Sequence, residues 1–176
     1  MTDKIVIHYS RFDLPLGNMT LVELDGALCM SDWTSSSRHQ RNVGKMSCRL
    51  GAILIEKKTQ FLCKVASELQ AYLEGKSGEL PGVVLNPAGT PFQMKVWDEL
   101  LAIPRGLTVS YSEVARRVGC RSGVRAVASA IAANPLSIFI PCHRVVPSSG
   151  GIGNYAGGSE AKATLLALEK QVQQIF

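Results

Sequence analysis

The sequence predicts a mixed α/β (α+β) fold in which a strand-rich first half precedes a mainly helical second half. Residues 4–33 contain short β-prone runs separated by turn residues. Residues 57–74 carry apolar side chains at helical spacing, and residues 90–134 carry several helix start and stop signals. A segment rich in Gly, Pro and Ser at 75–91 is typical of a linker between domains. We therefore expect two domains, residues 1–85 and 86–176.

The composition is that of an ordinary globular protein, with 46% hydrophobic and 19% charged residues in 176. No apolar run approaches the ~20 residues of a membrane span, so we expect no membrane partner. Residues 1–4 are not followed by a signal-peptide core, and we expect a cytoplasmic, intracellular protein. The five cysteines form no C-x-x-C pair, which predicts no metal site.

The net charge of +5 is concentrated in the second half. Residues 1–87 carry ten Lys or Arg against nine Asp or Glu, whereas residues 88–176 carry nine against five. Four arginines lie within 111–127, where Glu113 is the only acid. This cluster indicates a polyanionic partner, although a solvated basic face would look the same.

The first half reads as a meander of short strands over residues 4–33 followed by a polar segment. Residues 34–52 are ambiguous, and the run around Ser35 to Arg41 is typical of a surface loop. Residues 57–74 then form one apolar stripe at helical spacing, and Gly75 follows as a C-terminal cap.

The second half begins with a strong helix signal. Thr90 supplies a capping hydroxyl, Pro91 a first-turn proline and Gln93 the reciprocal side chain of a capping box. Ser110 and Glu113 form a second capping-box pattern, and the helix that they open ends at Gly119.

A further helix begins near Ser122 and ends by Asn134, because a residue that precedes proline avoids the α region. The pair is a helix-turn-helix candidate. Apart from Arg125, the predicted outer face of the second helix consists of small residues: Ala126, Ser129, Ala130 and Ala133. Such a face can lie close to a DNA backbone or a shallow groove but cannot read bases deep in the major groove.

Residues 138–146 contain the most informative stretch of the chain. An apolar run predicts a buried strand that Pro141 ends, which places Cys142 at the mouth of the strand. His143 and Arg144 follow, and positive charge there favours the nucleophilic thiolate. A small buried hydrophobic residue is the alternative role of this cysteine.

Residues 147–158 contain five glycines and one large ring, Tyr155. They form either a flexible hairpin or a close-fitting wall around a planar ligand.

Several of these motifs together resemble the O-6-alkylguanine-DNA alkyltransferases, also called methylated-DNA–protein-cysteine methyltransferases. The matching runs, in order, are Tyr111, Arg125–Val127, Asn134–Pro135, Ile140–Val145 and Gly153–Gly158. The resemblance covers about residues 90–172 and is highly specific. Residues 1–85 are similar only loosely, in the manner of the variable N-terminal domain of the family, which has a ribonuclease-H-like βα fold.

The resemblance implies DNA repair by direct reversal: an alkyl group passes irreversibly from the guanine oxygen to Cys142 after the nucleotide is flipped out of the duplex. Each molecule would react once, without a cofactor. His143 would help to deprotonate Cys142 through a water, Glu169 would orient His143, and Asn134 would support the turn that shapes the site.

The resemblance also implies two sets of binding residues. The set expected to hold minor-groove DNA and flip the nucleotide is Tyr111, Ser112, Arg125, Ala126 and Ala130. The set expected to line the base pocket is Val145, Gly153, Asn154, Tyr155, Ala156 and Gly157. The implied partner is double-stranded chromosomal DNA that contains alkylated guanine, on which the protein would act as a monomer.

The chain departs from the family pattern at Ala156, where a serine is common, so one hydroxyl contact to the base is missing. No zinc ligand set of the kind found in some N-terminal domains can be matched. The main alternative is a lesion-sensing or regulatory DNA-binding protein with an inert cysteine. A cysteine hydrolase is a weaker alternative, because no hydrolase signature surrounds Cys142. The sequence leaves open whether O-4-alkylthymine is a substrate and how large an alkyl group is accepted.

Overall fold

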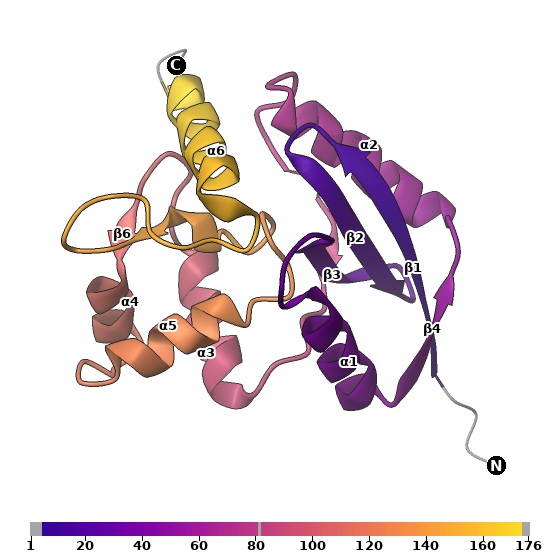
Figure 1. Ribbon diagram of the computed structural model, residues 1–176, viewed down its shortest axis with the longest axis horizontal. Helices are drawn as coiled ribbons and strands as arrows, with labels where there is room; N and C mark the ends of the chain where they lie inside the picture. The colour runs from indigo at the N-terminus through magenta and orange to yellow at the C-terminus, as the bar shows by residue number, and fades with distance from the viewer. Residues whose placement is uncertain (1–4, 81, 174–176) are drawn as a thin grey trace. The chain divides into compact units, whose positions relative to one another are not determined.

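The computed structural model describes residues 5–80 and 82–173, and the chain divides into two compact units, residues 1–88 and 89–176 (Figure 1). The first unit holds a five-stranded sheet and two helices, and the second is mainly helical. The predicted mixed α/β class is therefore confirmed. The more detailed expectation of a ribonuclease-H-like first domain stays a prediction.

The sheet of the first unit is built on a meander. Strands β1 (Ile5–Leu14), β2 (Gly17–Leu24) and β3 (Ala27–Trp33) pair antiparallel in sequence order, which confirms the predicted meander. Strand β4 (Ala52–Glu56) adds in parallel to β1, and β5 (Val84–Leu85) adds in parallel to β3. The strand order is β4-β1-β2-β3-β5, so the predicted linker contributes an edge strand to the sheet.

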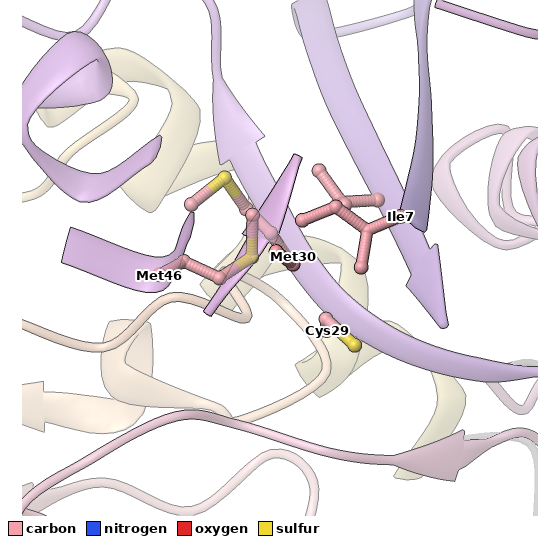
Figure 2. Packing of buried hydrophobic residues seen from close by; sticks show 6 residues of the cluster. Ile7, Cys29, Met30 and Met46 are labelled. Carbon is pink, nitrogen blue, oxygen red and sulfur yellow. The ribbon is translucent and has the colours of Figure 1, made fainter. Parts of the chain in front are cut away.

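Two helices complete the first unit. Helix α2 (Gln60–Leu73) lies where the apolar stripe predicts it, with Thr59 accepting a hydrogen bond from the Leu62 amide at its start. Helix α1 (His39–Leu50) lies in the segment that the sequence left ambiguous, and the loop expected around Ser35 to Arg41 is wrong only for residues 39–41, which belong to the helix. Its Met46 packs with Ile7, Val22, Cys29, Met30 and Ala52, a cluster drawn in Figure 2.

A polar network fixes the start of α1 to the sheet. Asp32 is 1% exposed and accepts from the amide of Trp33 at 3.0 Å and from Nδ2 of Asn42 at 3.1 Å. Nδ1 of His39 lies 3.4 Å from the same carboxylate, and its Nε2 lies 3.3 Å from the Thr20 hydroxyl. A cavity of about 640 Å³ borders this network, and its lining is Tyr9, Arg11, Thr20, Thr34, Ser36, Ser37, His39, Gln40, Val43 and Leu54.

The second unit contains four helices and one short parallel strand pair. They are α3 (Pro91–Leu101), α4 (Tyr111–Arg117), α5 (Val124–Ala132), α6 (Gly158–Gln173), β6 (Val109–Ser110) and β7 (Val145–Val146). The Thr90–Gln93 capping box is present in both directions. Ser110 caps α4 through the amide of Glu113. The Glu113 carboxylate, however, binds Arg116 and Arg117, so the second predicted box is only half formed.

Two local predictions for the second unit are wrong. Residues 138–140 are buried but form no strand: Ile138 has a φ of 74°, and the chain makes an isolated bridge between Ser137 and Ile140. Ala130 was expected on the outer face of α5, but it is 3% exposed and its carbonyl accepts from Nε1 of Trp97 at 2.9 Å. Ala130 therefore packs toward the core of the unit.

None of the helices in residues 5–80 and 82–173 combines the length and apolar composition that a membrane span requires.

Candidate active site

Cys142 opens a single 3₁₀ turn, Cys142–Arg144, that leads directly into β7. The side chain of Asn134 holds the segment before this turn. Its Nδ2 donates to the carbonyl of Ile140 at 2.9 Å, and its Oδ1 accepts from the amide of Leu136 at 2.9 Å. The amide of Cys142 then donates to Ile140 at 2.7 Å. Cys142 is only 9% exposed, so the residue is largely shielded from solvent.

Glu169 of α6 lies at the centre of a buried hydrogen-bond network beside this turn. Its Oε1 accepts from Nε2 of His143 at 2.8 Å and from Nη2 of Arg144 at 2.9 Å. Its Oε2 accepts from Nε of Arg144 at 2.9 Å and from the amide of Gly106 at 3.4 Å. Burial opposes ionisation, but the hydrogen bonds from His143 and Arg144 hold the pKa of Glu169 well below its usual range. Glu169 is therefore a carboxylate at neutral pH.

His143 is fully buried, and burial lowers its pKa despite the bond to Glu169. It is therefore neutral at neutral pH. Because Nε2 donates to Glu169, the second ring nitrogen, Nδ1, carries a lone pair. Within the described part of the chain Nδ1 has no hydrogen-bond partner, so it is available as a proton acceptor. The expectation that His143 supplies positive charge to Cys142 is wrong for this reason.

Lys162 of α6 is a site residue that the sequence reasoning missed. Its side chain is 0% exposed, and its ammonium donates to the carbonyl of Val145 at 2.7 Å and of Asn154 at 3.5 Å. Burial lowers the pKa of Lys162, and the negative charge of a Cys142 thiolate acts against that shift. A buried cation is thus within electrostatic reach of the sulfur. The sequence of α6 does not distinguish Lys162 from the exposed Lys170 of the same helix, so it carried no signal that could have found the buried lysine.

Tyr111 opens α4, and burial together with the charge of Cys142 raises the pKa of its hydroxyl. The hydroxyl therefore stays protonated and can donate a hydrogen bond near the sulfur. Ser112, the next residue, is exposed and its hydroxyl lies 3.0 Å from that of Ser148. This contact joins the start of α4 to the start of the glycine-rich loop.

The glycine-rich loop has a backbone conformation that favours glycine at several positions. Gly150, Gly151, Gly153 and Gly158 all have φ between 75° and 92°. A Cβ added to Gly153 would lie 2.9 Å from Cδ of Pro147, which leaves room only for glycine. The loop therefore packs closely at Gly153, whereas an added Cβ at Gly150, Gly151 or Gly158 would meet nothing within 4 Å, and the expected pocket wall stays a prediction.

The side chains of the predicted pocket set differ in accessibility. Asn154 and Ala156 are exposed, and Gly153, Tyr155 and Gly157 are partly exposed. The ring of Tyr155 meets that of His143 edge-on, with centroids 6.2 Å apart. Val145 is fully buried and its carbonyl accepts from Lys162, so its place in the pocket set stays a prediction.

On α5, Arg125 and Ala126 are both exposed at the first turn, as expected for a binding face. The prediction for Ala130 does not hold, because that residue is buried. Arg144 was predicted as a cation acting on Cys142, but it binds Glu169 and donates to the carbonyl of Ile103 at 2.6 Å. Its role is therefore to hold the carboxylate that orients His143.

The mainly helical second unit thus holds a buried cysteine next to a neutral histidine that donates to an ionised carboxylate, a set of groups used in nucleophilic catalysis. Within the described residues, no group of three or more His, Cys, Asp or Glu side chains is placed to hold a metal ion.

Residues 91–171 match the family model of the 6-O-methylguanine DNA methyltransferase DNA-binding domain. The methylated-DNA–protein-cysteine methyltransferase of Mycobacterium leprae is 35% identical over 94% of this chain and 93% of its own. The inducible methyltransferase of that name from Bacillus subtilis is 45% identical over 69% of this chain and 66% of its own. The chain therefore belongs to the methylated-DNA–protein-cysteine methyltransferase family.

Solved structures agree with this assignment. The crystal structure of Mycobacterium tuberculosis OGT in complex with DNA superposes with a TM-score of 0.78, at 35% identity over 93% of both chains. The O6-methylguanine-DNA methyltransferase from the archaeon Pyrococcus kodakaraensis KOD1 superposes at 0.66, with 25% identity over 93% of this chain and 98% of that one.

Proposed function

We propose that this protein repairs DNA by transferring a methyl or larger alkyl group from O-6 of guanine to Sγ of Cys142. The thiolate attacks the alkyl carbon, an S–C bond forms, and the C–O bond breaks with its electron pair returning to the guanine oxygen. The guanine anion then takes a proton from the Tyr111 hydroxyl, which solvent replaces. The product is a thioether, which cannot readily release the alkyl group, so each molecule reacts once. No cofactor enters this balance.

The observation that carries the proposal is the chemical state of His143. A neutral imidazole whose Nε2 donates to an ionised Glu169 has Nδ1 free to accept the thiol proton, directly after Cys142 in the chain. Neighbours in a 3₁₀ turn do not face one another, so the proton passes through a bridging water. This follows the logic of a general base that a third group holds in orientation.

The sulfur is shielded within the protein, and its target carbon lies inside a base stack, so the nucleotide must rotate out of the duplex. The exposed Arg125 at the start of α5 is suited to fill the vacated stack, and the small Ala126 beside it allows the helix to approach a minor groove closely. Helices α4 and α5 then act as a helix-turn-helix. The segment Gly153–Gly157 receives the rotated base, and Tyr155 contributes the aromatic ring of this segment.

The first experiment is the intact mass of the protein after incubation with a duplex that contains one O-6-methylguanine, followed by peptide mapping. We expect one methyl group per protein, located on Cys142, with an equal loss of the lesion. Cys142→Ser should retain DNA binding and take up no methyl group. Tight binding without any mass change in the wild-type protein would refute the proposal and favour a lesion-sensing protein. The same assay with O-4-alkylthymine decides whether that base is also a substrate.

A further inference from the structure

The segment from residue 33 to residue 55 is strongly basic, although the unit to which it belongs has a net charge close to zero. It contains four cationic residues, and no Asp or Glu lies between Asp32 and Glu56. The four are Arg38, Arg41, Lys45 and Arg49, and all are exposed. Residues 1–87 as a whole are close to neutral, so the positive charge is local rather than a property of the unit.

Helix α1 brings these four residues, here called the α1 basic stripe, onto one side. At 3.6 residues per turn they fall within an arc of roughly 80°. Met46, which anchors the helix in the core, and His39, which binds Asp32, lie outside this arc. The fold thus fixes the direction of the stripe, because the opposite side of the helix is held by both apolar packing and a buried carboxylate.

The central residues of the stripe are not neutralised by neighbouring acids. In the part of the chain that the structure describes, neither Arg41 nor Lys45 pairs with a carboxylate. Other helical cations do so: Lys64 pairs with Glu68, as Arg116 and Arg117 pair with Glu113. Surface charges usually gain little from pairing, but two cations one helical turn apart that pair with no carboxylate, Arg41 and Lys45, contribute a positive potential that attracts a polyanion.

We propose that the α1 basic stripe binds the phosphate backbone of duplex DNA, as a contact separate from the one made by α4 and α5. From Arg41 to Arg49 the stripe extends about 12 Å along the helix, a length over which one DNA strand presents three or four phosphates at about 3.4 Å each. Long cationic side chains at this spacing position a protein on DNA without reading its sequence. The inference rests on the proposed function only in taking DNA as the partner, and it does not depend on chemistry at Cys142.

The test uses the full-length chain, an unmodified duplex and binding measured from 50 to 200 mM salt. Each phosphate contact contributes about 0.9 to the slope of log K against log salt concentration. R41Q combined with K45Q should therefore lower the slope by about 1.8, so that the wild type loses about twelvefold more affinity than the variant across this range. The matched control is K57Q with K58Q, which removes the same charge from exposed positions of the same unit and should leave the slope unchanged.

Equal slopes for the wild type and the R41Q/K45Q variant would overturn the inference. An equal decrease of the slope in the K57Q/K58Q control would also overturn it, because the effect would then follow from net charge alone. Methyl uptake from a saturating concentration of lesion duplex separates this result from a failure of the proposed function. The R41Q/K45Q variant should still place one methyl group on Cys142. If the stripe instead serves an acidic protein surface, DNA binding will be unaffected, and the inference is then wrong.

Discussion

Replacing Glu169 by glutamine is the most direct test of the buried network beside Cys142. The substitution keeps the shape of the side chain but removes its charge and converts one acceptor oxygen into an NH₂ donor. In the wild-type protein both carboxylate oxygens accept from donors, including His143, Arg144 and the amide of Gly106. In either orientation of the new amide, its NH₂ group faces an N–H donor that a carboxylate oxygen accepted from in the wild-type protein.

The expected cost follows from the burial of the partners. Glu169 is 0% exposed and the Arg144 side chain is 10% exposed, so the variant leaves a guanidinium buried without its counter-charge. Removing one partner of a buried ion pair costs about 3–5 kcal/mol. We expect Glu169→Gln to lower the free energy of unfolding of the second unit by that amount. Glu160→Gln, an exposed position on the same helix, should change it by less than about 0.5 kcal/mol.

Urea unfolding followed by tryptophan fluorescence measures this difference. The chain has two tryptophans, one in each unit, so a Trp33→Phe background leaves Trp97 as the reporter of the second unit. A loss below about 1 kcal/mol in Glu169→Gln, equal to the Glu160→Gln control, would refute the view that the carboxylate is the counter-charge of the site.

The pH dependence supplies an independent check. The pKa of Glu169 is lowered by folding, so its charge stabilises the folded state fully above the unfolded pKa of about 4.3. This stabilisation is lost as the pH falls below that value toward the lowered folded pKa. The difference in unfolding free energy between the wild type and Glu169→Gln should therefore be constant near neutral pH and shrink below about pH 4.

Three further predictions concern the loop, the DNA face and the base. In denaturant unfolding, Gly153→Ala should destabilise the second unit by about 1–3 kcal/mol more than Gly151→Ala. Both glycines have positive φ, but only at Gly153 would the added Cβ meet Pro147. Equal losses of stability would show that this contact is unimportant. Arg125→Ala should slow methyl uptake from a paired guanine more than from a mispaired one, since less unpairing energy is then needed, and equal slowing would exclude a role in filling the stack. Burial lowers the pKa of His143 from its usual value of about 6.5. The rate of single-turnover methyl transfer should therefore stay constant as the pH falls to 6.5 and decline only below that pH. A decline that begins above pH 6.5 would contradict the role of His143 as a neutral buried base.

The sequence predicted best where the determining signal is local. The capping box of Thr90 and Gln93 defines the start of α3 because all its partners lie within four residues. Helix α1 was missed although Val43, Met46 and Leu50 have helical spacing. Its N-cap residue, Arg38, makes no side-chain cap, and the helix is stabilised by contacts with distant strands.

The strand expected before Cys142 was wrong for a related reason. Apolar composition predicted burial correctly at Ile138 and Ile140 but did not specify backbone conformation. Asn134, which the family resemblance singled out, closes this segment as a turn through hydrogen bonds to Leu136 and Ile140. A buried turn and a buried strand have the same apolar pattern, and only the polar partner distinguishes them.

The role of charge in the site could not be derived from neighbours in the chain. His143 and Arg144 follow Cys142 directly, yet the first is neutral and the second is matched by Glu169, 25 residues away. Lys162 is a further buried cation, and a Cys142 thiolate would raise its pKa against the effect of burial. The cation that would favour a Cys142 thiolate is therefore a lysine twenty residues further along the chain and not the adjacent histidine, whose pKa burial lowers.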